Sequence, residues 1–334
     1  MSAQIEHAGS SGDSRSSAAR PALAPEDARS MRPDIDRDVI RGRRFDLSTM
    51  FLPIGLSLVD ELGFLAPADR RLFSQVQGRT YANVFDLAER FLGTRMLEAS
   101  RNRWPGDQAA LEALVRISGD EELEHQRLFL RIEQMLAEVM PAGYEFTARP
   151  HEVAGAVLAR STWAVLAFML DIDLFTQVHY RESLRQDAGL SELWKDVFLF
   201  HWQEESQNAI GVELELLRED AAIDGAARDH AVGDFIELVG ALDGILRVQA
   251  SADSDWFMHV AASRYTPVQQ AAIHHQFLKA YRWQYIVSGS QVPRFGKVLA
   301  GMLDEAQRKR IADALAPLSY AVPASPGERL PVFV

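Results

Sequence analysis

The fold of this 334-residue chain is decided by residues 111–136, which read LEALVRISGDEELEHQRLFLRIEQML. Apolar residues recur in this stretch every three or four positions, which is the period of an amphipathic α-helix. The apolar stripe consists of Leu111, Val115, Phe129, Ile132 and Leu136. Between its two ends the same face carries Glu122 and His125, which are three residues apart. Polar side chains on a packed face need partners, because burying them without one costs free energy.

The helical pattern continues along most of the chain. It predicts helices at 67–78, 81–103, 107–139, 152–186, 190–220, 227–250, 267–288 and 304–315. No run shows the alternation and β-branched enrichment of a β-strand. The four consecutive helices between residues 81 and 220 each have 20 residues or more, so each would span about 30 Å or more, the length of a four-helix bundle. The sequence therefore predicts an all-α fold built on such a bundle.

The chain divides into four regions by composition and pattern. Residues 1–36 are rich in Ser, Ala, Gly and Pro and lack apolar periodicity, so we expect a disordered N-terminal tail. Residues 37–80 are expected to form a strap and a short helix. The bundle occupies 81–220, and the helices of 221–334 are expected to pack on it.

Polar residues also interrupt the apolar stripes of the other long helices. Glu89 stands in the otherwise apolar stripe of the first. In the fourth, His201, Glu205 and Asn208 follow one another at spacings of four and three residues, so they share one face. Because charged residues normally lie on the solvent face of a bundle helix, these positions are candidates for function.

The third long helix contributes Asp173, with Asp171 on another face as an alternative, since this helix is apolar on most sides. Glu89 and Glu122 are 33 residues apart, and Asp173 and Glu205 are 32 apart. Two helical hairpins of equal length would bring these four acids to one level. Buried carboxylates repel unless they are protonated or neutralised by a cation. A single Glu-x-x-His motif is expected by chance in a chain of this composition, but four matched acids favour a metal centre over a buried hydrogen-bond network.

A carboxylate on one helix and Glu-x-x-His on the next, followed by a similar pair, resembles the ligand set of ferritin-like di-iron and di-manganese carboxylate proteins. The resemblance covers about residues 81–215, and His201 is similar to the additional histidine of the arylamine N-oxygenase branch. It implies the metal ligands Glu89, Glu122, His125, Asp173, His201 and Glu205. Two positions depart from the pattern: Asp173 where Glu is usual, and Asn208 where the second motif has His.

The resemblance implies a di-metal cofactor, Fe/Fe or Mn/Fe, bridged by Glu122 and Glu205. Hard carboxylate and imidazole donors suit these metals. The implied activity is the O₂-dependent oxygenation, hydroxylation or N-oxidation of a small organic substrate, with an electron donor as a further partner. Tyr180, two turns from Asp173, is a candidate hydrogen-bond or radical partner, and the alternative is a core tyrosine. His179 is expected to face a neighbouring helix or solvent.

Composition and charge argue against several kinds of binding partner and several kinds of metal site. The chain has 47 acidic and 35 basic residues, so its net charge of −12 disfavours nucleic acid and anionic membranes as partners. Without cysteine it has no disulfide, zinc–thiolate site or iron–sulfur cluster. No apolar run approaches the length of a membrane span, and the first thirty residues lack the apolar core of a secretory signal. We therefore expect a cytoplasmic protein, for which a homodimer is the commonest assembly.

Two other functions stay open at this point. A catalytically altered or metal-poor ferritin-like protein with a binding or structural role is favoured by Asn208 and Asp173. Iron storage in a multi-subunit cage fits less well, because residues 221–334 would have to be accommodated in the cage wall.

Overall fold

The computed structural model describes residues 34–101 and 108–323, apart from the side chains of residues 91–122, 204, 206 and 207. Within this part of the chain every regular element is helical, and the only extended pairing is an isolated bridge between Met50 and Leu190. The predicted all-α class is confirmed. The predicted tail lies almost wholly outside the described residues.

The helices follow one another without an intervening strand in the described residues. The α-helices are α2 (Ile54–Ser57), α3 (Pro67–Arg101), α4 (Gln108–Val139), α5 (Pro150–Leu158), α6 (Thr162–Val178), α7 (Glu192–Ala222), α8 (Gly225–Val260), α9 (Pro267–Arg282), α10 (Ser288–Ser290), α11 (Pro293–Met302) and α12 (Glu305–Leu315). Short π or 3₁₀ turns are η1 (Ile35–Ile40), η2 (Val59–Glu61), η3 (His179–Leu184), η4 (Trp283–Val287) and η5 (Ala316–Ala321).

Side-chain caps fix several of the helix starts. The Ser191 side chain accepts a hydrogen bond from the Trp194 amide at the start of α7, and Asp224 accepts one from the Ala227 amide at the start of α8. Thr266 begins α9 with a reciprocal capping box to Gln269. These side chains satisfy amide donors that the first turn of a helix leaves unpaired. The predicted starts of these helices lie within two residues of the observed ones.

Several of the predicted helices have wrong boundaries, and one of them, predicted at 227–250, continues to Val260 as α8. The helices predicted at 67–78 and 81–103 are one continuous helix, α3. The helix predicted at 152–186 is divided into α5 and α6, because the backbone of Ser161 is extended, with ψ at 146°. The Asp234 carboxylate of α8 accepts the Ser161 amide at 2.8 Å and so stabilises the break. Helix α11 was not predicted.

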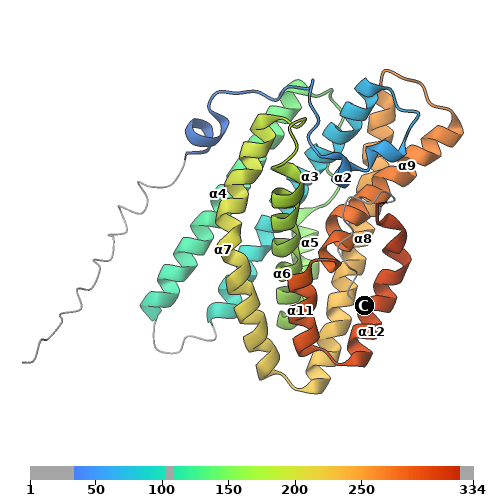
Figure 1. Ribbon diagram of the computed structural model, residues 1–334. Helices are drawn as coiled ribbons and strands as arrows, with labels where there is room; N and C mark the ends of the chain where they lie inside the picture. The colour runs from blue at the N-terminus through green and yellow to red at the C-terminus, as the bar shows by residue number, and fades with distance from the viewer. Residues whose placement is uncertain (1–33, 102–107, 324–334) are drawn as a thin grey trace, which may run out of the picture.

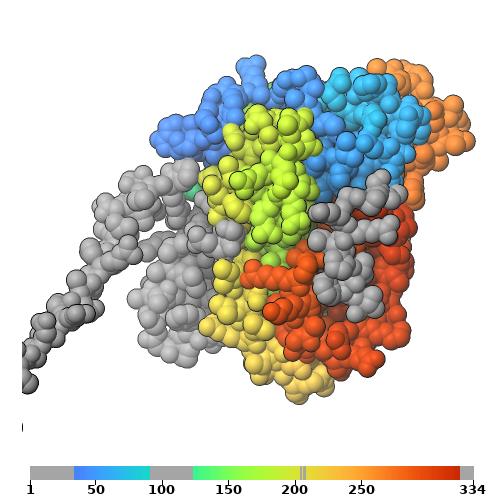
Figure 2. Space-filling model, viewed as in Figure 1, coloured from blue at the N-terminus to red at the C-terminus, as the bar shows by residue number. Residues whose placement is uncertain are grey.

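The long helices pack as antiparallel pairs. Helix α3 packs on α4 and α6 packs on α7, while α8 packs on α6 and α3, and α9 packs on α8 (Figure 1). Helix α6 thus lies inside the molecule, in contact with α7, α8, α10 and α11. The space-filling view shows the strap that precedes α3, in blue, at the opposite end of the molecule from the α7–α8 turn, in yellow (Figure 2). In the described chain, no helix combines the length and the apolar character needed to cross a bilayer.

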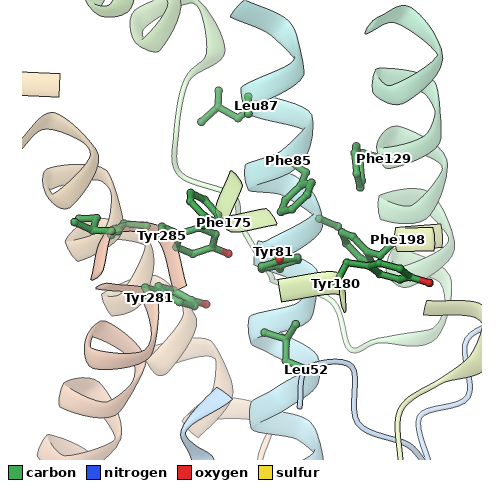
Figure 3. Packing of buried hydrophobic residues seen from close by; sticks show 14 of the residues in the cluster. Leu52, Tyr81, Phe85, Leu87, Phe129, Phe175, Tyr180, Phe198, Tyr281 and Tyr285 are labelled. Carbon is green, nitrogen blue, oxygen red and sulfur yellow. The ribbon is translucent and has the colours of Figure 1, made fainter. Parts of the chain in front are cut away.

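Aromatic side chains fill the centre of the core. Tyr81 and Phe85 of α3 point toward Phe198 of α7 and Tyr285 of η4, and their ring centroids lie 4.6 to 5.9 Å apart (Figure 3). Such separations are typical of favourable aromatic pairs. One continuous core joins the N-terminal strap, the long helices and the C-terminal helices. Burial of this aromatic layer positions α3 and α7 on either side of the candidate site.

Candidate metal centre

Four buried ligand-capable side chains meet between three helices. Glu89 comes from α3, His125 from α4, and His201 and Glu205 from α7. One ligand atom of each lies within 4.8 Å of the others. His201 and Glu205 are one turn apart, so α7 presents both to the same point. The sequence pattern named all four residues as metal ligands, and the fold brings them together.

The Glu89 carboxylate lies between the two imidazoles. His201 Nε2 is 2.8 Å from Glu89 Oε1, and His125 Nδ1 is 3.2 Å from Glu89 Oε2. Burial alone would raise the pKa of Glu89, but attraction to His125 and hydrogen bonds from both imidazoles outweigh it, so this pKa lies well below its usual range. Glu89 is therefore held as a carboxylate, the form that binds a metal.

Aromatic rings hold the His201 imidazole in place. The ring centroids of Phe85 and Phe129 lie 5.1 and 5.2 Å from that of His201, both near edge-on. The His125 ring lies 4.7 Å from the His201 ring. Packing of this kind restricts the rotamers of the imidazoles, so little reorganisation is needed when a ligand binds.

Among the described residues, one oxygen atom each of Glu205 and Asp173 has no hydrogen-bond partner. These atoms are Asp173 Oδ2 and Glu205 Oε1, which lies 3.0 Å from His125 Nδ1 but outside hydrogen-bond geometry. Asn208 Nδ2 donates to the other Glu205 oxygen at 3.2 Å. Unpaired buried carboxylate oxygens are costly, and a bound cation would satisfy them.

Asp173 on α6 lies close enough to the cluster for the charges of Glu205 and Glu89 to shift its pKa. Burial, together with repulsion from Glu205 and Glu89, holds the pKa of Asp173 well above its usual range. A cation among these three carboxylates would reverse that shift. The donor set and the unpaired oxygens together fit a metal ion.

Asp171, the alternative to Asp173, lies elsewhere. Its carboxylate packs against the backbone of Gly289 in α10 and lines a different cavity. Burial raises the pKa of Asp171 to about 8. Two residues along a helix correspond to a rotation of about 200°, which explains why the two aspartates face opposite sides of α6.

Of the other expected site residues, one is described only by its backbone and one lies beside the cluster. The Glu122 side chain lies outside the described residues, although its backbone belongs to α4. Tyr180 stacks on Trp202, with ring centroids 5.2 Å apart, and lines a small pocket that His201 and Glu205 also line. It is thus a buried neighbour of the cluster, on another side from Asp173.

An apolar cavity of about 90 Å³ opens onto the cluster. Glu89, Asp173, His201 and Glu205 form one part of its wall. The remainder is almost entirely aliphatic and aromatic: Val84, Phe85, Leu87, Ala88, Val153, Ala156, Val157, Phe168, Ile172, Phe175, Leu238, Ala241, Leu242, Ile245, with Thr176 and Tyr285. The Tyr285 hydroxyl has no hydrogen-bond partner among the described residues. An apolar wall with a few polar groups is the lining that small-molecule sites have, although this cavity is smaller than the roughly 300–1,000 Å³ of drug-sized sites.

The sequence did not single out the buried Tyr81–His179–Ser288 chain. Tyr81 Oη lies 3.0 Å from His179 Nδ1, and His179 Nε2 lies 3.0 Å from Ser288 Oγ. Burial lowers the pKa of His179 to about 3, so the imidazole is neutral. The expectation that His179 faces solvent is wrong, whereas the alternative, a neighbouring helix, is correct. A lone His in an apolar helix gives no sequence signal for its partner.

Comparison with known protein families, curated proteins and solved structures finds no match for this chain. Its chemistry must therefore be inferred from the cluster and the cavity.

Proposed function

We propose that this protein is a ferritin-like, non-haem metal oxidoreductase that uses O₂ to oxidise a small organic substrate. The observation that carries the proposal is the buried cluster of Glu89, His125, His201 and Glu205 at the wall of an apolar cavity. A structural metal would not need such a cavity beside it. Conversely, an apolar binding pocket alone would not need three carboxylates and an imidazole at its wall.

The donor set favours iron or manganese. Carboxylate oxygens and imidazole nitrogens suit Fe(II) and Mn(II), and the chain has no cysteine to select a softer metal. The four clustered residues can hold one ion. Asp173 and Glu122 are the proposed additional ligands of a second ion, giving the Fe/Fe or Mn/Fe pair that the ligand pattern implies.

The protein's own groups would position the substrate and exclude water. The apolar wall binds a hydrophobic body, and the unpaired Tyr285 hydroxyl is available to one polar atom of the substrate. The bound metal would supply the redox chemistry with O₂ that no side chain here provides. Oxygenation, hydroxylation and N-oxidation are the proposed reaction types, with reducing equivalents from a separate electron donor.

Metal content tests this proposal directly. Protein produced with iron and manganese supplied is expected to carry at least one of these ions per chain. Glu89→Gln and His201→Ala should lower the content at least tenfold while the helical circular dichroism is retained, because each removes a donor from the cluster. His259→Ala is the matched control, since His259 is exposed on α8. O₂ consumption with a chemical reductant should follow metal content.

Two outcomes would overturn the proposal. One is folded wild-type protein that contains no iron or manganese after supplementation. The other is equal metal in the wild type and in both cluster variants.

A metal-poor helical protein with a binding role is the second candidate. It is favoured by Asn208, whose amide already donates to Glu205 and binds metals far less well than imidazole. This candidate predicts a folded chain without metal and a cavity that binds an apolar ligand without consuming O₂.

A further inference from the structure

A second, larger cavity lies on the other side of α6. Its volume is about 580 Å³, within the range of small-molecule sites. Residues of α6, α8, η4, α10, α11 and α12 line it, and α8, α11 and α12 lie on this side of the molecule in Figure 1. The wall is mainly apolar and includes Phe235, Ile286, Phe295 and Leu299.

Asp171 is the buried polar group of this cavity. The residue is only 6% exposed, and its Oδ1 atom has no hydrogen-bond partner among the described residues. No cationic side chain of the described chain forms an ion pair with it. Ser290, a second polar residue of the wall, donates its hydroxyl to the Val287 carbonyl. Asp171 therefore lacks a hydrogen-bond or ion-pair partner for this oxygen within the part of the chain that the structure describes.

Gly289 provides the space that the Asp171 carboxylate occupies. A Cβ atom at residue 289 would lie 2.5 Å from Asp171 Oδ1 and 2.9 Å from Oδ2. Real Cβ atoms do not approach so closely, so any other residue would displace the carboxylate. The sequence thus accommodates an acid at a position where an aliphatic residue would pack at less cost.

Basic side chains lie at the solvent side of the same cavity. Lys297 and Arg308 belong to its lining and are both exposed. Because water already solvates them, they do not require a ligand. Asp171 has no such solvation, so its carboxylate decides which chemical group the cavity would take.

We propose that this cavity binds an amphipathic amine, whose ammonium group pairs with Asp171 and whose apolar body contacts Phe235, Phe295 and Leu299. The ammonium group would hold Asp171 as the carboxylate, and a charge-assisted hydrogen bond to a buried carboxylate is stronger than one between neutral groups. An apolar body of moderate size would fill the cavity and exclude water from the ion pair. The site is separate from the metal cluster, and its occupation does not depend on the proposed oxidoreductase activity.

Isothermal titration of the full-length protein with octylamine, octanol and octanoate tests the inference. Octylamine should bind at least tenfold more tightly than octanol, which has the same chain but no charge, and octanoate should be the weakest. Asp171→Asn should reduce octylamine affinity at least tenfold and leave octanol affinity unchanged. Glu89→Gln, which alters only the metal cluster, should leave octylamine binding unchanged.

Three results would overturn the inference: no binding of any probe, octanol or octanoate binding as tightly as octylamine, or unchanged octylamine affinity in Asp171→Asn. The comparison of probes on the wild type needs no variant, so it decides the matter even where Asp171→Asn fails to fold. Failure here would leave the metal cluster unaffected, and failure of the metal analysis would leave this site unaffected.

Discussion

His179 shows how much a single buried residue determines. The Ser288 hydroxyl donates its one proton to the Gln284 carbonyl, so it accepts a hydrogen bond from His179 Nε2–H. His179 Nδ1 is then free to accept the Tyr81 hydroxyl. One neutral tautomer of His179 thus forms both hydrogen bonds, and these link η3 to α3 and to α10. Protonation would remove the acceptor and place a charge in the core.

The first prediction concerns His179 and pH. Its pKa of about 3 in the folded protein lies below the ordinary value of 6.5, so the unfolded chain takes up the proton first as pH falls. The stabilising contribution is therefore complete above pH 6.5 and is lost between pH 6.5 and pH 3. Relative to His179→Phe, the wild type should lose about 2 kcal/mol of unfolding free energy between pH 7 and pH 5.

Urea denaturation of both proteins at several pH values measures this difference. Asp253 of α8, a buried acid whose pKa burial raises to about 7, is present in both proteins, so its titration cancels in the comparison. Tyr81→Phe is the control, because it breaks the same hydrogen bond but keeps the titrating imidazole. A pH-independent difference between the wild type and His179→Phe would contradict the prediction.

Sequence periodicity found the residues of α3, α4 and α7 that face the cluster because those helices are amphipathic. On α6, where residues 163–171 are all buried, it named Asp173 but left Asp171 as an alternative. A helix surrounded by other helices has no polar face to fix its rotation, so Asp171 and Asp173 could not be distinguished. The partner of His179 could not be predicted either, because Ser288 lies 109 residues away along the chain.

At the scale of elements, the N-terminal strap is held by polar side chains of α3. Ser74 Oγ binds the backbone of Phe51 and Leu52, and Gln75 Nε2 donates to the carbonyls of Leu47 and Thr49. Those bonds require the strap to lie directly on the helix. A residue without a side chain on α3 allows that approach.

Gly78 is that residue, and it carries the second prediction. A Cβ atom there would lie 2.6 Å from Phe51 Cβ, a contact that neither backbone can relieve without moving. Gly78→Ala should therefore destabilise the protein by about 1–3 kcal/mol, despite the higher helix propensity of Ala. Thermal unfolding followed by circular dichroism measures the change.

Gly240→Ala on α8 is the matched control. No atom lies within 4 Å of a Cβ built at this exposed helical position, so the same substitution should stabilise by about 0.5–1 kcal/mol. Equal effects of the two substitutions would mean that the strap does not lie on α3 as described.

The division between α5 and α6 shows why local pattern could not supply the whole helix arrangement. Residues 152–178 remain apolar enough to read as one helix, and Ser161 is a weak breaker by itself. What stabilises the break is Asp234, a residue of α8 that is distant in sequence and accepts the Ser161 amide. The break also turns α5 toward α3, where Val153 and Val157 become part of the cavity wall.

At the scale of the whole molecule, α6 separates two sites that use acids in different ways. Asp173 faces a cluster that already contains two further carboxylates, whereas Asp171 faces an apolar cavity alone. The acids on both sides are buried at a cost in folding free energy. A ligand that binds only the folded chain would offset this cost, because its binding contributes stability.

The last prediction concerns Asp173→Asn. It follows from the cost of burying the acid and from the stability that a bound metal would contribute. In the metal-free protein this substitution removes a carboxylate that is repelled by Glu205 and Glu89, so the unfolding temperature should stay the same or rise. With iron or manganese added, the wild type should gain about 2.7 kcal/mol when the free metal reaches one hundred times its dissociation constant. Asp173→Asn should lose at least half of that gain, because an amide is a poorer ligand than a carboxylate. Thermal scans with and without metal, before and after chelation, measure both effects. A binding site predicts that Asp173→Asn lowers stability only when metal is present, whereas the loss of a purely structural acid would change stability equally with and without metal.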